Sequence, residues 1–217
     1  MAQLGSYDSE AQNHDAPVAG LNGVILALAP ALLGATMVAP LPVVPLIVEE
    51  FGGRDRLVSL ALTIPILTAA LSGIALAFLG DRVDRRSAFI AGALIFSIAG
   101  PAPVLLDSLS LILISRGIAG LALGTMMNTG LGLVADYYKE ERRTFWLAAQ
   151  SSIPAGAVIG AALVAGWLGN WGWRAPFALL AVGAVVFVLS IKLARPIASA
   201  TQLPRAPIRK VASVKVV

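Results

Sequence analysis

The sequence predicts an all-α integral membrane protein with six transmembrane helices. Hydrophobic residues make up 58% of the 217 residues and charged residues only 13%, whereas a soluble domain carries about 25% charged residues. Six apolar runs follow one another, each close to the roughly 20 residues that a helix needs to cross a bilayer core. Backbone polar groups in lipid must be satisfied internally, and long runs without strand alternation achieve this as helices.

The predicted elements begin with a tail over residues 1–20. It is polar and acidic and contains no Lys or Arg, unlike a secretory signal peptide, so we predict a flexible cytoplasmic segment. The six-helix bundle is predicted over residues 21–194, followed by a basic cytoplasmic segment over residues 195–217. The six predicted spans are 21–48, 57–79, 88–106, 109–135, 144–168 and 175–194. Four prolines predict a kink near the end of the first span: Pro30, Pro40, Pro42 and Pro45.

The distribution of basic residues predicts the orientation of the spans. Twelve lysines and arginines fall on one side of the predicted bundle, namely Arg82, Arg85, Arg86, Lys139, Arg142, Arg143, Lys192, Arg195, Arg205, Arg209, Lys210 and Lys215. Three fall on the other side, Arg54, Arg56 and Arg174. Because basic loops stay in the cytoplasm, we expect both termini there and the bundle in the inner or plasma membrane. An aromatic belt is expected at the outer boundary, formed by Trp167, Trp171 and Trp173.

A dense cluster of charge separates the second and third spans. Asp81 is placed to cap a neighbouring helix or to pair with a basic residue, while Arg82, Arg85 and Arg86 are placed to bridge to acidic groups of adjacent loops. One hypothesis is therefore a latch between loops at this face of the membrane. The other is a short positive-inside hairpin with incidental acids, and charge alone does not separate the two.

Three residues of the fourth span share one helical face. Arg116, Gly120 and Gly124 recur every four residues, and glycine at this spacing lets another helix approach closely. Arg116 is expected about two turns inside the membrane boundary, where an arginine costs up to about 3 kcal/mol. The alternative is that its side chain snorkels to the interface.

Together these patterns resemble the Major Facilitator Superfamily of secondary transporters. The family's loop pattern G-x-L-A-D-R-x-G-R-R is similar to residues 77–86, and its helix pattern R-x-x-x-G-x-x-x-G is met by the fourth span. Asp136 and Arg143 fit the acid and the arginine, seven residues apart, that commonly follow that helix. Residues 169–177 are similar to the G-W-R-x-x-F pattern that begins the family's sixth helix.

The chain departs from the family patterns at several positions. Ala77 and Asp84 stand where the loop pattern has glycine, and Asp84 adds a negative charge to a turn that is usually uncharged. The fifth span lacks the proline and the glycine pair typical of drug–proton antiporters. We predict that its Ser152, Gly156 and Gly160 form a small-residue packing stripe instead.

The resemblance implies twelve helices in two six-helix halves, each a 3+3 inverted repeat, with the substrate cavity between the halves. This chain supplies six helices, so we expect one cavity wall, lined by the first and fourth spans with parts of the second and fifth. A second half is then expected from another copy or a separate chain. In this half-transporter, a small solute moves by alternating access, with efflux as one direction. Asp81, Arg82, Arg85 and Arg86 would latch the cytoplasmic gate, and Arg116 would organise the fourth helix.

Five polar side chains at membrane depth are the candidate cavity residues: Thr36, Asn128, Thr129, Gln150 and Ser151. A polar group at this depth either lines water or bonds to a helix. Both hypotheses stay open for each residue.

Other function classes lack the residues they need. There is no cysteine, the single histidine is His14 in the tail, and no embedded carboxylate pair or serine–histidine arrangement serves catalysis. We expect no enzymatic activity, cofactor, metal or nucleic-acid partner; membrane lipid, a small solute and a second half are the expected partners. The alternative hypothesis is a truncated or non-transporting half that acts only as a packing partner or remnant.

Overall fold

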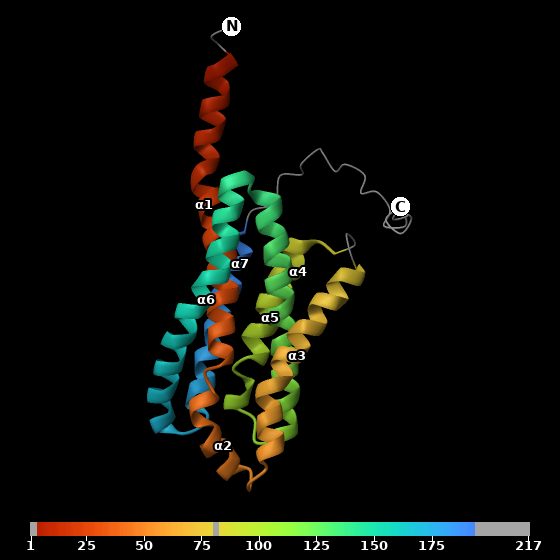
Figure 1. The fold of residues 1–217 in the computed structure, drawn as a ribbon, viewed down its shortest axis with the longest axis vertical. Coiled ribbons are helices and arrows are strands. Elements are labelled where there is room, and N and C mark those ends of the chain that lie inside the picture. The colour runs from red at the N-terminus through yellow and green to blue at the C-terminus, as the bar shows by residue number, and fades with distance from the viewer. Residues whose placement is uncertain (1–3, 80–82, 194–217) are drawn as a thin grey trace, which may run out of the picture.

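The computed structural model describes the chain over residues 4–79 and 83–193, and describes side chains from residue 20 onward (Figure 1). Within these residues the chain is helical and contains no strand. The elements are α1 (Leu4–Met37), η1 (Leu41–Val43), α2 (Val44–Glu50), α3 (Asp55–Leu79), α4 (Arg85–Ala99), η3 (Ala102–Val104), α5 (Leu109–Tyr137), α6 (Glu140–Leu168), η4 (Gly169–Trp171), η5 (Ala175–Ala181) and α7 (Val182–Ile191).

The predicted spans coincide with these helices. Among the described residues, five segments are long and apolar enough to cross a membrane: Gly20–Glu50, Asp55–Leu79, Arg85–Val104, Leu109–Tyr137 and Glu140–Trp171. The sixth apolar segment, Ala175–Ile191, is shorter and is divided between η5 and α7. The all-α membrane fold predicted from the sequence is confirmed.

The first span is bent where its prolines predict a bend. α1 ends at Met37, and the chain passes through a turn and η1 before α2 continues the span to Glu50. Pro40, Pro42 and Pro45 lie in this stretch, and proline cannot donate the backbone hydrogen bond that continues a helix. At its other end α1 begins at Leu4 and extends beyond the bundle (Figure 1), through the segment predicted to be a flexible tail.

The packing of the helices follows an inverted repeat. α5 packs most extensively against α3 and also against α4, while α1 packs most extensively against α6 and also contacts α7. The two triplets of the repeat are α1, α3 and α4, and α5, α6 and α7. In this repeat α1 corresponds to α5, α3 to α6, and α4 to α7. α4 also packs against α7, and α1 against α5, as helices related by the repeat.

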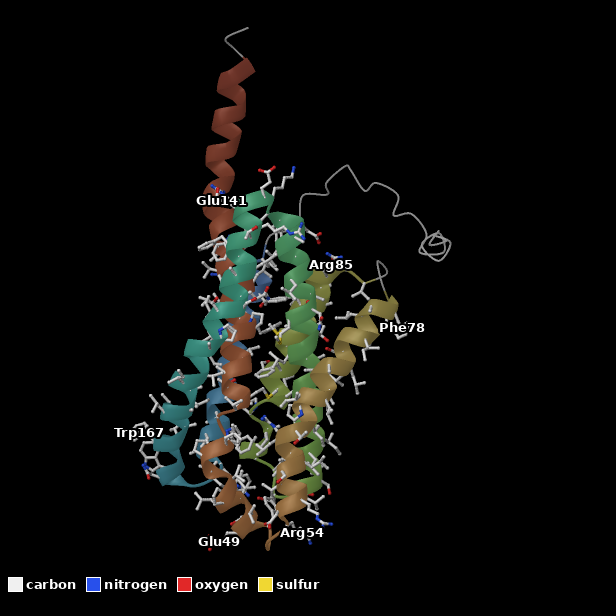
Figure 2. All side chains as sticks on the ribbon, viewed as in Figure 1. Glu49, Arg54, Phe78, Arg85, Glu141 and Trp167 are labelled. Carbon is white, nitrogen blue, oxygen red and sulfur yellow. The ribbon has the colours of Figure 1, made fainter. Side chains whose placement is uncertain are left out.

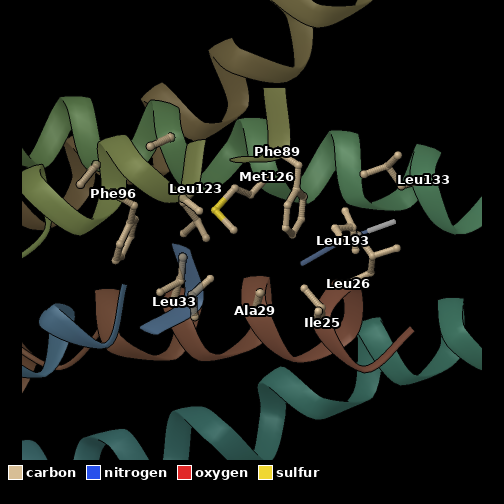
Figure 3. Packing of buried hydrophobic residues seen from close by; sticks show 14 of the residues in the cluster. Ile25, Leu26, Ala29, Leu33, Phe89, Phe96, Leu123, Met126, Leu133 and Leu193 are labelled. Atoms are coloured by element: carbon tan, nitrogen blue, oxygen red, sulfur yellow. The ribbon is translucent and has the colours of Figure 1, made fainter. Parts of the chain in front are cut away.

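The core lies between α1, α4 and α5. Leu26 and Leu33 of α1 face Phe89 and Phe96 of α4 and Met126 of α5, all fully buried (Figure 3). α3 and α6 by contrast present most of their apolar side chains outward. Exposed apolar area of this size is typical of a surface covered by lipid or by another protein.

The bundle has two chemically different ends (Figure 2). The basic end contains the start of α4, the end of α5 and the start of α6, with Arg85 and Glu141. The tryptophan end contains α2, the start of α3 and the end of α6, with Arg54 and Trp167.

The predicted packing stripe on α6 is wrong for contacts within this chain. Ser152, Gly156 and Gly160 are exposed, and a Cβ added at either glycine would meet no atom within 4 Å. The stripe lies on the face of α6 that turns away from the bundle.

Candidate functional site

The charged turn at the basic end, residues Asp84-Arg85-Arg86, contacts the ends of two other helices. Arg85 donates to both carboxylate oxygens of Asp136 at the end of α5, at 3.1 and 3.3 Å. Arg86 donates through Nε to the carbonyl of Leu193 at 2.7 Å and through its terminal nitrogen to that of Ile191 at 3.2 Å. These carbonyls lie at the C-terminal end of α7, where a helix has acceptors without partners and a partial negative charge. The turn therefore bridges the start of α4 to the ends of α5 and α7.

Two residues of the predicted latch, Asp81 and Arg82, lie outside the described residues. Arg143, the other member of the predicted loop pattern, is exposed on α6, and Asp136 is paired with Arg85. Arg85 therefore meets an acidic group, as the bridging hypothesis expects, whereas Arg86 binds backbone carbonyls instead of an acid. The role of Asp81 stays a prediction.

The contacts of Asp84 explain why an aspartate can stand where the family pattern has glycine. Its backbone is extended, with φ −66°, so no left-handed conformation requires glycine there. Its side chain accepts from the backbone amide of Ser87 at 3.0 Å and caps the start of α4. Hydrogen bonds from Ser87, first from its side chain and then from its backbone, lower the pKa of the Asp84 carboxyl below its usual 3.8.

Arg116 is buried inside the bundle, with 2% of its surface exposed. Its guanidinium donates to the carbonyl of Gly100 at 2.7 Å, contacts the sulfur of Met37 at 3.6 Å, and lies 5.1 Å from the ring centroid of Phe177. The snorkelling alternative is therefore wrong. Since Gly100 follows the last residue of α4, Arg116 caps the C-terminus of that helix, where a positive charge is favourable.

The charge of Arg116 has no carboxylate partner among the described residues, whose two ion pairs lie elsewhere. Its Nε is buried without a hydrogen-bond partner in that part of the chain. A buried ionisable group within a membrane span is expensive, and such groups mark functional positions by default.

Gly120 and Gly124 allow α3 to lie directly on α5. A Cβ at Gly120 would overlap Thr68 and the backbone of Pro65, and one at Gly124 would overlap Ser72 and the backbone of Ala69. The close approach expected from their spacing is confirmed.

Four of the five candidate cavity residues bond to their own helices. Thr36 donates to the Leu33 carbonyl at 2.9 Å, Asn128 to Gly124 at 2.7 Å, Thr129 to Thr125 at 2.6 Å and Ser151 to Leu147 at 3.0 Å. Such bonds to the preceding turn satisfy a side-chain donor without a second helix. Thr36 and Thr129 are buried, whereas Asn128 and Ser151 are exposed.

Gln150 differs from the other four candidates because it crosses between helices. It lies buried on α6, and its amide nitrogen donates to the carbonyl of Leu26 in α1 at 3.4 Å. A Cβ at Gly130 of α5 would lie 3.1 Å from the same nitrogen. Its oxygen is buried without a partner among the described residues. Gln150 therefore marks the junction of α1, α5 and α6.

The contacts at the tryptophan end were missed by sequence reasoning. Trp173 is 8% exposed and meets Phe51 edge-on, with ring centroids 5.6 Å apart. Arg174 pairs with Asp107 and lies over the Trp173 ring, 4.9 Å from its centroid. The G-W-R pattern signalled this segment. The ion-pair partner of Arg174 lies 67 residues away in sequence, and Phe51 lies in another span than Trp173, so no local pattern identifies either partner.

The long apolar helices of the described residues define an integral membrane protein built as an α-helical bundle. The family model described as Major Facilitator Superfamily matches residues 24–216, and the chain belongs to this superfamily.

Individual relatives are transporters of the same superfamily. The chain is 27% identical over 136 residues to the probable transporter AQR1 of Saccharomyces cerevisiae, which covers 62% of this chain and 23% of that protein. It is 30% identical over 119 residues to the multidrug resistance protein MdtM of Escherichia coli, covering 54% of this chain and 29% of that protein. It is 25% identical over 156 residues to the multidrug transporter protein MdtP of Bacillus subtilis, covering 70% and 28%. The chain thus spans less than a third of each of these relatives.

Proposed function

We propose that this chain forms one six-helix wall of a secondary transporter that exports a small solute by alternating access. The observation that carries the proposal is the charged turn at the basic end, where Arg85 and Arg86 bind the ends of α5 and α7. In a transporter that opens alternately at its two faces, rigid-body movement of the halves changes the packing at each face, and we propose that these contacts hold the helix ends of this half together at one face. Membership in the superfamily and the multidrug relatives support export of a small, amphipathic solute.

A second six-helix half belongs to this proposal. The outward apolar faces of α3 and α6 are suited to lipid on one side and to a second half on the other.

The orientation is proposed from charge, with the basic end in the cytoplasm of the inner or plasma membrane. Six of the described basic side chains, Arg85, Arg86, Lys139, Arg142, Arg143 and Lys192, lie at or near the basic end, as the positive-inside rule requires. A cysteine at position 139 should react with an impermeant maleimide only after cells are permeabilised; reaction in intact cells would reverse the orientation.

The function is tested by energised efflux of ethidium from cells that carry this chain together with a second six-helix half. Asp136→Asn should leave membrane insertion intact and abolish most of the efflux, because the neutral amide no longer pairs with Arg85. Glu141→Gln, at an exposed acid of the same end, is the matched control and should retain efflux. Normal efflux in Asp136→Asn would remove the latch. Efflux absent with every partner half tested would favour the non-transporting packing partner.

A further inference from the structure

The inverted repeat relates two turns at opposite ends of the bundle. Exchange of α3 with α6 and of α4 with α7 places the turn between α3 and α4 in correspondence with the turn between α6 and η5. At the basic end, Asp84 ends the first turn and caps α4, and Arg85 and Arg86 are the first two residues of α4. These three residues correspond to the second turn, Gly172-Trp173-Arg174, at the tryptophan end.

The two turns make corresponding contacts in the same order. Arg85 contacts the end of α5, and Trp173 contacts Phe51 at the end of α2, which closes the span related to α5. Arg86, the residue after Arg85, binds carbonyls at the end of α7. Arg174, the residue after Trp173, pairs with Asp107 after η3, which closes the span related to α7. Two independent contacts thus obey the same symmetry.

We infer that the Gly172-Trp173-Arg174 turn is a second brace, which holds together the ends of the first and third spans at the tryptophan end. The first brace is Asp84-Arg85-Arg86, which holds together the ends of the fourth and sixth spans at the basic end. The role of the second brace in gating rests on the proposed function, whereas its effect on the bundle does not.

The second brace is apolar at Trp173, where the first is ionic at Arg85, and both braces also use an arginine, Arg174 and Arg86. Trp173 packs within a buried cluster at the tryptophan end, formed by Val43, Ile47, Val58, Leu109, Ile112, Trp173 and Phe177. Its ring contacts Phe177 as well, at 90° and 6.1 Å between centroids. Gly172 has φ 111°, a conformation that side chains rarely adopt, and so permits the turn that aims Trp173 inward. Aromatic contacts are insensitive to salt, unlike an exposed ion pair.

The chain contains no cysteine, so single cysteines can report local opening. The two reporters are Ile112→Cys and Val134→Cys, both on α5. Ile112 is 2% exposed and lies near the tryptophan end, and Val134 is 0% exposed and lies near the basic end. The reaction rate of each with a water-soluble maleimide is measured on the full chain in nanodiscs. Trp173→Ala should raise the rate at Ile112→Cys about tenfold, because the cluster loses its central ring, and leave Val134→Cys unchanged.

Trp171→Ala is the matched control, because that tryptophan is 63% exposed two residues earlier; it should change neither rate. Phe51→Leu provides a milder variant should Trp173→Ala fail to fold, and should raise only the rate at Ile112→Cys. An unchanged rate at Ile112→Cys, an equal rise at both reporters, or an equal effect of Trp171→Ala would each overturn the brace. Absence of ethidium efflux with the parent chain would refute the proposed function, but it would not change the interpretation of this labelling experiment.

Discussion

The two helix crossings related by the inverted repeat, α3 on α5 and α6 on α1, are closed by different chemistry. At the first, Gly120 and Gly124 face the backbone of Pro65 and Ala69. At the second, the indole of Trp146 covers Gly23, while a Cβ added at Gly156 or Gly160 of α6 would meet no atom of another helix within 4 Å. Glycine therefore sets the distance between helices only where another backbone meets it. A crossing closed by backbone contact has little freedom to change, whereas one closed by a side chain can move when that side chain turns.

The largest effect is expected from adding a methyl group to the first crossing. Gly120→Ala places its Cβ against Thr68 and the backbone of Pro65, and backbone cannot move aside as a flexible side chain can. We expect a loss of about 2–3 kcal/mol in the free energy of unfolding, measured by denaturant titration in mixed micelles.

The control for this prediction is Gly156→Ala, which adds the same methyl group to open space on α6. It should be neutral or stabilising by up to about 1 kcal/mol. Equal losses in the two variants would show that the contact at the crossing is not the cause, because helix propensity alone favours alanine at both positions.

This contrast marks how far sequence reasoning extends. The apolar runs predict the spans, and the spacing of Arg116, Gly120 and Gly124 predicts a close contact that the structure confirms. The same reasoning predicts packing at Gly156 and Gly160, where there is none. In a membrane helix all faces are apolar, so the amphipathic pattern that identifies the buried face of a soluble helix is absent.

The candidate site was predicted less completely than the fold. The sequence identified Arg85, Arg86 and Asp136 as charged groups near one face, but the Arg85–Asp136 pair joins residues 51 positions apart. Thr36 and Thr129 were candidates for a cavity, yet both donate to their own helix. A hydroxyl's choice between its own carbonyl and a distant partner depends on its rotamer and on its neighbours, which composition and spacing do not encode.

An intermediate effect is expected at the second crossing. Trp146→Ala removes the ring that covers Gly23 and contacts Tyr138 and Phe145. Because Trp146 is only half buried, we expect a loss of about 1–2 kcal/mol, below the 3–5 kcal/mol typical of a fully buried ring. The same titration in mixed micelles measures it. Phe145→Ala is the adjacent control, since that ring is exposed, and should cost less. A loss at Trp146 larger than at Gly120 would reverse the assignment of the tighter crossing.

The smallest effect concerns the turns that leave the two crossings, which are also built differently. α6 continues into η5 through Gly172 with its positive φ, whereas α3 continues into α4 through Asp84, whose side chain caps the new helix. Since hydrogen bonds hold the pKa of folded Asp84 below 3.8, its ionised form contributes stability above the pKa of the unfolded chain. That contribution is lost as the pH falls through the lower pKa of the folded state.

Asp84→Asn keeps a side chain that can cap a helix but cannot ionise, so the difference between parent and variant isolates the charge. We expect the parent to be more stable at pH 7 by less than about 1 kcal/mol, because the site is exposed. The difference should be constant from pH 7 to about pH 5 and shrink toward zero below about pH 4. Melting temperatures of both proteins across this range measure it. A difference that grows as the pH falls would mean that Asp84 is stabilised in its protonated form, and the turn from α3 into α4 would then owe its stability to some other contact.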